Sequence, residues 1–269
     1  MCNQRNVKYG KGIVHENVKV ADNTFRLTLI AEEKLPTIEP GQFVMLRLPK
    51  TSDPLLGRPL AVYRTDGDRC LEVVYIVVGT MTARLSQVAL SSELEFWTPL
   101  GNGFPASDAK HTIMVAGGIG QTPFLLLSKK LTSRKTLLYG TMTANRLAGI
   151  EDFEQADVDI HIATNDGSKG YHGFVTDLIE QVYRPGESTR ILCCGPHSML
   201  QAAYCVARRL GLSCEVSLET PMSCGLGICF GCVVKYRNSL EDETFDYKRT
   251  CLDGPVFDAY RLYWNETPE

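Results

Sequence analysis

Residues 111–124 read HTIMVAGGIGQTPF, an apolar run that passes through three glycines before Gln-Thr-Pro-Phe. This pattern predicts a buried β-strand, a tight turn and the start of a helix. Gly117, Gly118 and Gly120 would let backbone amides and the helix N-terminus approach a pyrophosphate, although a tight strand–helix turn also selects glycine. The spacing differs from G-x-G-x-x-G, so the segment does not predict an ordinary dehydrogenase.

Strands and helices continue to alternate after this segment. The strand candidates are His111–Gly117, Lys135–Gly140, Val158–Thr164, Arg190–Gly195 and Cys214–Glu219. A helix is expected over His197–Leu212, with Met199, Ala203 and Val206 on one face. Alternating units with nearly continuous apolar strands predict an α/β doubly wound parallel sheet, which we assign to a nucleotide-binding domain at residues 108–215.

A second nucleotide-binding candidate is CCGP at residues 193–196. Cys194, Gly195 and Pro196 end a later strand of the same sheet, and such carboxyl ends bind ligands in open α/β sheets. Cys193 is equally well explained as a buried strand residue. The five histidines show no metal-ligand spacing, and no Ser/His/Asp arrangement stands out, so no catalytic residue is predicted.

The chain before the nucleotide sheet is rich in short β-segments. Thr24–Ile30 alternates apolar and polar side chains, and Gly41–Pro49 and Leu71–Gly79 are further strand candidates bounded by Pro or Gly. Many short strands without long helices predict an antiparallel β-barrel, assigned to residues 1–107.

Cysteines gather in CGLGICFGC at residues 224–232. Cys224, Cys229 and Cys232 have the C-x4-C-x2-C spacing of a plant-type [2Fe–2S] cluster, and Cys251 is the candidate fourth ligand. The intervening glycines suit a loop that must turn its backbone N–H groups toward the cluster sulfurs. Zinc is the alternative, but its sites usually show two separated C-x2-C pairs. A cluster-binding segment is therefore predicted at residues 216–269.

The composition excludes several classes of protein function. The net charge is −3 and the pI about 6.0, so no basic excess indicates binding to nucleic acid or anionic lipid. The first residues lack the apolar stretch of a signal peptide, and no run approaches a membrane span. Ten cysteines in a chain of 269 residues indicate metal or redox chemistry rather than a secreted disulfide scaffold, and a cytoplasmic location is expected.

Arg58 is unusual because it stands inside the apolar segment GRPLAVY, residues 57–63. A guanidinium in such a strand predicts pairing with an anion, either a ligand phosphate or the carboxylate of an internal salt bridge.

The order of barrel, nucleotide sheet and cysteine loop resembles the ferredoxin reductase-like flavoproteins. More closely, it is similar to the iron–sulfur electron-transfer subunits of NAD-linked dihydroorotate dehydrogenases. The resemblance covers nearly the whole chain. Its most specific segments are SLETPMSCGLGICFGCVV (217–234), YKRTCLDGPVF (247–257) and PLGNGF (99–104), with NDGSKGYHGFVTDLI (165–179) in support.

The resemblance implies FAD, NAD(P) and a [2Fe–2S] cluster as cofactors. The positions implied for FAD are Arg58, Pro59, Leu60, Ala61, Tyr75, Ile76, Val77, Met81 and Thr82; those for NAD(P) are Gly117, Gly118, Gly120, Cys194, Gly195 and Pro196. Ala61 replaces a hydroxyl residue of the family and Met81 a glycine, so both put the usual hydrogen bonding of the flavin, and its redox potential, in question. Arg146 would meet the 2′-phosphate of NADP or serve as a surface cation, which leaves NAD against NADP open.

The implied function is electron transfer in pyrimidine biosynthesis. Electrons would pass between NAD and an FMN-containing dihydroorotate dehydrogenase subunit, in a heterotetramer of two plus two chains. A flavin must stand between the other two centres, because a nicotinamide exchanges two electrons as hydride and a [2Fe–2S] cluster exchanges one. The alternatives are a subunit of a ferredoxin:NAD(P) oxidoreductase or hydrogenase-type complex, a self-contained reductase for a soluble carrier, and a redox sensor.

Overall fold

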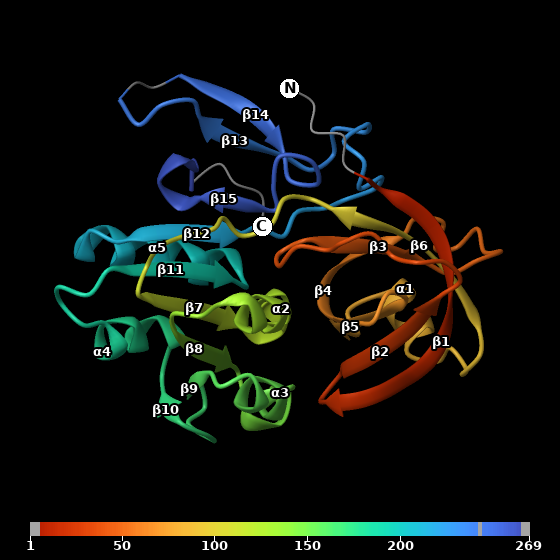
Figure 1. Ribbon diagram of the computed structural model, residues 1–269, viewed down its shortest axis with the longest axis horizontal. Coiled ribbons are helices and arrows are strands. Elements are labelled where there is room, and N and C mark those ends of the chain that lie inside the picture. Colours follow the sequence, from red (N-terminus) through yellow and green to blue (C-terminus); the bar gives the residue numbers. More distant parts are fainter. Residues whose placement is uncertain (1–5, 242–243, 265–269) are drawn as a thin grey trace.

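The computed structural model describes residues 6–241 and 244–264. Figure 1 shows a barrel built from the first third of the chain, an α/β sheet beside it, and a small hairpin above the sheet. The predicted fold class is confirmed by this arrangement.

The barrel is closed by antiparallel neighbours in the order β1-β2-β5-β4-β3-β6. Its strands are β1 (Lys8–Ala21), β2 (Thr24–Ala31), β3 (Phe43–Arg47), β4 (Arg58–Asp66), β5 (Cys70–Ile76) and β6 (Glu93–Leu100). The predicted strands at Thr24–Ile30, Gly41–Pro49 and Leu71–Gly79 correspond to β2, β3 and β5. The short helix α1 (Thr80–Leu85) follows β5 and inserts Met81 and Leu85 into the barrel core.

The nucleotide sheet has the strand order β10-β9-β8-β7-β11-β12-β15. Its strands are β7 (His111–Gly117), β8 (Arg134–Thr141), β9 (Asp159–Thr164), β10 (Tyr171–His172), β11 (Thr189–Cys194), β12 (Ser213–Ser217) and β15 (Val256–Asp258). Neighbours pair in parallel from β10 to β12, as predicted. The edge strand β15 is antiparallel to β12 and comes from the cluster-binding segment, so that segment is built onto the sheet.

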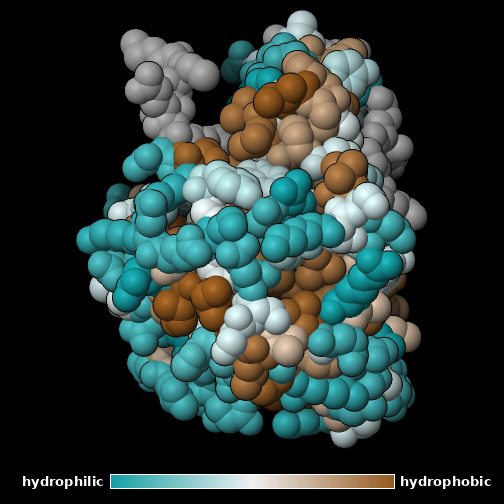
Figure 2. Space-filling model, turned by 90° about the vertical axis from the view of Figure 1, so that its right-hand side faces the viewer, coloured by the Kyte–Doolittle hydropathy of each residue, from teal (hydrophilic) through white to brown (hydrophobic). Residues whose placement is uncertain are grey.

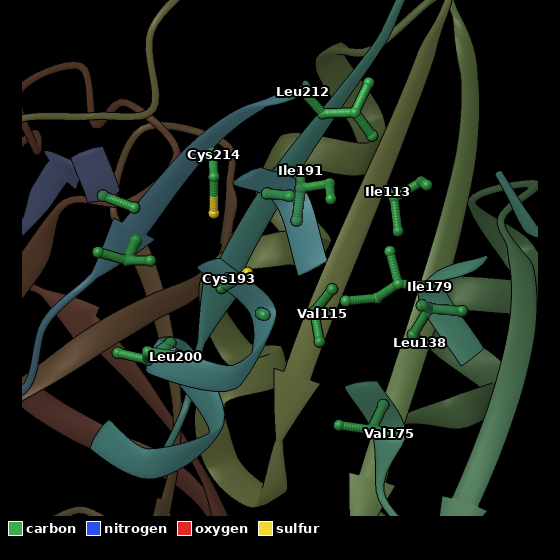
Figure 3. Close-up of a cluster of buried hydrophobic side chains, with 14 of the residues drawn as sticks. Ile113, Val115, Leu138, Val175, Ile179, Ile191, Cys193, Leu200, Leu212 and Cys214 are labelled. Atoms are coloured by element: carbon green, nitrogen blue, oxygen red, sulfur yellow. The ribbon is translucent and has the colours of Figure 1, made fainter. Parts of the chain in front are cut away.

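Helices cover both faces of this sheet. They are η1 (Gly118–Gln121), α2 (Thr122–Lys130), η2 (Ala144–Arg146), α3 (Ile150–Gln155), η3 (Val175–Leu178), α4 (Ile179–Val182), α5 (His197–Leu210) and η4 (Ala259–Arg261). On one face, side chains of β7, β8, β11 and β12 meet η3, α4 and α5, and Figure 3 shows Ile113, Val115 and Cys193 in this core. The opposite face packs against α2 and α3. Helices on both faces explain why the central strands are apolar throughout.

Helix α5 differs from the prediction in which residues it buries. Leu200, Ala203 and Ala207 face the sheet, whereas Met199 and Val206 are only partly buried at the margin of the stripe. The spacing i, i+3, i+7 follows one face of a helix with 3.6 residues per turn. Gly211 ends the helix with a left-handed backbone at φ +68°.

The barrel and the sheet share their hydrophobic cores. Leu126 of α2 belongs to the barrel core, and Tyr63 of β4 and Val74 of β5 pack with Met114 and Phe124 on the sheet side. This apolar interface fixes the carboxyl edge of the parallel sheet beside the barrel. A ligand at that edge would therefore lie close to one bound by the barrel.

The remaining hairpin consists of β13 (Val233–Arg237) and β14 (Phe245–Arg249). The cysteine loop lies between β12 and β13 and rests on the barrel. The indole Nε1 of Trp97 donates to the Cys224 carbonyl at 3.0 Å. The fold thus holds the cysteine loop against the barrel on one side and the sheet edge on the other.

Candidate functional site

The cysteine loop has a backbone that few side chains tolerate. Gly225 and Gly227 have φ +69° and +78°, in the left-handed region that favours glycine. A Cβ on Gly225 would lie 2.6 Å from Cγ of Met45 in the barrel wall. These glycines therefore let the loop both turn sharply and press onto the barrel.

The four predicted ligands, Cys224, Cys229, Cys232 and Cys251, come together as two pairs. The Sγ atoms of Cys232 and Cys251 are 3.2 Å apart, and the Cys251 N–H points to Cys232 Sγ at 3.4 Å. The thiol of Cys229 forms a side-chain hydrogen bond with Cys224. The segment containing Cys251 thus folds back onto the loop, as the proposed fourth ligand requires.

The loop also stabilises a thiolate at Cys224. Burial opposes ionisation of this thiol, but N–H groups of Cys229, Leu226 and Ile228 outweigh it and lower the pKa of Cys224 to about 6. The Leu226 N–H lies 3.3 Å from the sulfur. Backbone donors around a sulfur are what an anionic iron–sulfur centre needs.

The paired arrangement suits two metal ions better than one. Two sulfurs bound tetrahedrally to one metal at about 2.3 Å lie about 3.8 Å apart, close to the 3.2 Å between Cys232 and Cys251. Within residues 6–241 and 244–264, no group of three or more His, Cys, Asp or Glu side chains is close enough to hold a metal ion. The pairing of the four cysteines fits a [2Fe–2S] cluster, which takes two thiolates per iron.

At the sheet edge, the two predicted nucleotide-binding turns touch each other. A Cβ on Gly120 would lie 2.1 Å from the Cys194 carbonyl oxygen, and one on Gly195 would lie 2.9 Å from Cα of Gly117. Gly195 itself has φ +150°. Only glycine permits such an approach, and packing of the turns accounts for these glycines without a ligand.

A cavity of about 330 Å³ opens beside the second turn. It is lined by Gly195, Pro196, His197, Ser198, Leu200, Leu218 and Glu219. Cys193 points into the apolar core instead, which supports its interpretation as a buried strand residue. The buried Cys194 lies on the opposite face of β11 and is hydrogen-bonded to Ser217.

Glu219 is a cavity residue that the sequence analysis missed. It is the second residue after β12, and this position was the available signal, since carboxyl ends of parallel strands meet at the ligand edge. Its side chain opens to the cavity, and desolvation by the surrounding protein raises its pKa. The lining of the cavity thus includes one carboxyl group and one imidazole, those of Glu219 and His197.

The FAD candidates lie at one end of the barrel, where β4 begins and its hydrogen-bonded neighbour β5 ends. Pro59, Leu60 and Ala61 are partly exposed on β4, as are Ile76 at the end of β5 and Val77 after it. Tyr75 is buried, stacks on Phe25 and donates its hydroxyl to Asn17, so only its backbone is available to a ligand.

Arg58 has its Nη1 on the Leu56 and Gly57 carbonyls at 3.0 and 3.1 Å. No carboxylate in the described residues forms an ion pair with it. The internal salt bridge considered from the sequence is therefore not found there. A partly exposed guanidinium with spare donors fits a phosphate of FAD.

Thr82 and Met81 have roles within the protein. The Thr82 hydroxyl accepts from Val78 N–H and Gly79 N–H at 3.0 and 3.2 Å, which shapes the exposed turn before α1. The Met81 side chain is buried in the barrel core. The family's glycine is thus replaced here by a residue whose side chain turns away from the surface.

Together, the barrel, the nucleotide edge and the cysteine loop define a flavin- and iron–sulfur-dependent oxidoreductase of the ferredoxin reductase-like class. Residues 219–263 match the iron–sulfur cluster binding domain of dihydroorotate dehydrogenase B, and residues 114–204 match the oxidoreductase NAD-binding domain. The chain is 34% identical to the dihydroorotate dehydrogenase B (NAD⁺) electron transfer subunit of Caldanaerobacter subterraneus, over 92% of this chain and 95% of that one. The subunit of the same name from Geobacillus thermodenitrificans is 38% identical over 89% and 93%.

Solved structures agree with this class. A structure described as NADH-dependent reduced ferredoxin-NADP oxidoreductase superposes with a TM-score of 0.83 at 26% identity, covering 94% of this chain and 90% of that one. The FAD/NAD-binding domain of a Vibrio cholerae nitric oxide dioxygenase shares the fold, with a TM-score of 0.68 at 18% identity, covering 77% of this chain and 98% of that one.

The chain belongs to the family of dihydroorotate dehydrogenase B electron transfer subunits. Its cofactors are FAD, an iron–sulfur cluster and NAD. Among the described residues, no helix is long and apolar enough to cross a membrane.

Proposed function

We propose that this chain carries electrons between NAD and a catalytic partner subunit that oxidises dihydroorotate, in pyrimidine biosynthesis. The observation that supports this most strongly is the continuity of two sites along one segment. Glu219 lines the nucleotide cavity, and Cys224 begins the cluster loop only five residues later. Five residues span at most about 18 Å even when fully extended, so the segment keeps both sites close.

Each cofactor is assigned residues by this proposal. Arg58 would pair with the FAD pyrophosphate, and the exposed backbone at Leu60–Ala61 and Ile76–Val77 would line the flavin. Thr82 would hold the turn at Val78–Gly79 in the shape that accepts the cofactor. Gly117, Gly118, Gly120 and Cys194–Pro196 would bind the nicotinamide nucleotide, and Cys224, Cys229, Cys232 and Cys251 the [2Fe–2S] cluster. Together the bound groups supply the conversion between two-electron and one-electron transfer.

The partner would dock where the cluster is nearest to solvent. Leu226, Ile228 and Phe230 of the cysteine loop are 44%, 74% and 60% exposed. Figure 2 shows hydrophobic residues gathered at the top of one face of the molecule, above the barrel. Exposed apolar side chains in one loop are typical of a protein interaction site. We assign this loop to contact with an FMN-containing dihydroorotate dehydrogenase subunit, in a heterotetramer of two plus two chains.

A second candidate function is electron transfer within a ferredoxin:NAD(P) oxidoreductase complex. The superposition on such an enzyme with a TM-score of 0.83 favours it. The curated relatives favour the dihydroorotate function, because their identities of 34% and 38% exceed the 26% of that structure.

The test is to isolate the chain from native extract without oxygen and identify what accompanies it. An FMN-containing partner, with dihydroorotate reducing NAD⁺ only when both chains are present, is the expected result. Iron and acid-labile sulfide should be found in equal amounts. A large multi-cluster partner that gives no dihydroorotate oxidation would instead assign the chain to the ferredoxin-type complex.

A further inference from the structure

Asp152 connects the nucleotide domain to the barrel through three barrel side chains. The Tyr63 hydroxyl donates to its Oδ2 at 2.7 Å, and Nη1 of Arg64 donates to its Oδ1 at 3.4 Å. Nη1 of Arg26 lies 4.0 Å from Oδ2. The Asp152 side chain is only 15% exposed, so these contacts lie largely out of water, where they are stronger. A single carboxylate on α3 thus meets both β2 and β4.

The barrel holds the other side of this network in place. Nη2 of Arg64 donates to Glu72 Oε2 at 3.1 Å, and the Thr28 hydroxyl donates to the same oxygen at 3.3 Å. Glu72 is 5% exposed. Because Arg64 is fixed by a buried partner on β5, its contact with Asp152 has a defined direction. The hydrogen bonds of Arg64 therefore fix α3 relative to the barrel wall.

The start of α3 is shaped to receive Tyr63. Gly149 precedes the helix with φ +73°, and a Cβ there would lie 2.4 Å from the Tyr63 hydroxyl oxygen. Tyr63 is fully buried. Burial and the Asp152 carboxylate raise the pKa of Tyr63 well above its ordinary value, so the phenol stays a hydrogen-bond donor. Gly149 thus leaves room for the Tyr63 hydroxyl, and Asp152 accepts its hydrogen bond.

The segment held by Asp152 leads back to the nucleotide edge. It runs from the end of β8 through η2, where the Asn145 carbonyl accepts from Asp22 N–H of the barrel at 2.9 Å. The Ala144 N–H donates to the Ser168 hydroxyl at 2.8 Å, which joins the loops that follow β8 and β9. These loops stand at the carboxyl ends of parallel strands, where a dinucleotide binds. A shift of α3 would therefore move this edge relative to the barrel.

We propose that Asp152 is a positioning residue for hydride transfer: it sets the distance and angle between the nicotinamide nucleotide on the sheet and the flavin on the barrel. This inference rests on the proposed function, in which both groups are bound by this chain. The shared apolar core already holds the two parts together, so loss of Asp152 should misalign them without separating them. Misplacement by about 1 Å can slow a reaction up to about a hundredfold.

The test mixes the full chain, holding FAD and its cluster, with NADH in the absence of oxygen. Asp152→Asn should lower the limiting rate of flavin reduction about tenfold or more and weaken the long-wavelength absorbance of a nicotinamide stacked on the flavin. The flavin midpoint potential should stay unchanged, because Asp152 does not touch the flavin in this assignment. Tyr63→Phe, which removes only the hydroxyl, should act in the same direction. The exposed neighbour on α3 provides the control, Glu151→Gln, which should behave as wild type.

A wild-type limiting rate and stacking band in both Asp152→Asn and Tyr63→Phe, with only the melting temperature reduced, would show that the network is structural and overturn the proposal. If Asp152→Asn fails to fold, Tyr63→Phe decides the question, because its ring keeps the core packing. If NADH reduces neither the wild type nor Glu151→Gln, the proposed function itself has failed.

Discussion

Arg58→Ala should weaken FAD binding while leaving the iron–sulfur cluster intact. Among the residues that the structure describes, the guanidinium contacts two carbonyls of its own turn, Leu56 and Gly57, and its other donors are available to a phosphate. Loss of a hydrogen bond to a charged group costs about 1.5–3 kcal/mol. At 1.4 kcal/mol per factor of ten, FAD should dissociate about 10- to 150-fold more readily.

Folding should be nearly unaffected by the same substitution. Leu56 is exposed and its released carbonyl can bond to water, whereas Gly57 is buried and loses one partner, so only a small loss of stability is expected. Arg58→Lys provides an intermediate case, because lysine keeps the charge but cannot bind a phosphate through two parallel hydrogen bonds. The expected order of FAD affinity is wild type, lysine variant, alanine variant.

The assay is serial dilution of the purified holoprotein, with release of FAD followed by its fluorescence. Iron and sulfide content and the thermal melting curve are measured on the same samples. The assignment of Arg58 to FAD fails if the alanine variant retains flavin like wild type at every dilution. Simultaneous loss of cluster and cooperative melting would show that Arg58 supports the fold instead.

Cys251→Ser should give an incomplete or labile cluster while FAD remains and NADH still reduces it, whereas Cys214→Ser, in the sheet core, should keep the cluster absorbance; the reverse result would refute the ligand assignment. Gly225→Ala should be less stable than Gly67→Ala by about 1–3 kcal/mol in urea unfolding, since both have positive φ but only Gly225 faces a close neighbour; equal losses would count against close packing of the loop on the barrel. Burial lowers the pKa of His111, so its contribution to stability should be present above about pH 6.5 and lost as the pH falls below it. His111→Asn should flatten that part of the pH dependence, and an unchanged slope between pH 7 and 5 would contradict the argument.

Local sequence patterns were sufficient for the architecture, and they selected the candidate cluster ligands. Strand–helix alternation predicted the parallel sheet because apolar runs and glycine turns reflect burial and backbone geometry within a few residues. The spacing of Cys224, Cys229 and Cys232 predicted a cluster loop because a single short loop must supply these ligands. Cys251 was the candidate fourth ligand beside this triplet, and the fold places its Sγ 3.2 Å from that of Cys232.

Contacts between distant segments were decided only by the tertiary structure. Tyr63 and Asp152 are separated by 89 positions, and nothing in the local pattern of either residue predicts their hydrogen bond. Glu219 gained its place in the cavity because β11 and β12 are neighbours, and Met81 proved to be a core residue because α1 folds into the barrel. The physical reason is that a sequence pattern carries information about neighbouring positions only. Periodicity predicts which face of a helix or strand is buried, whereas the residues that pack against that face depend on how separate elements are arranged in space.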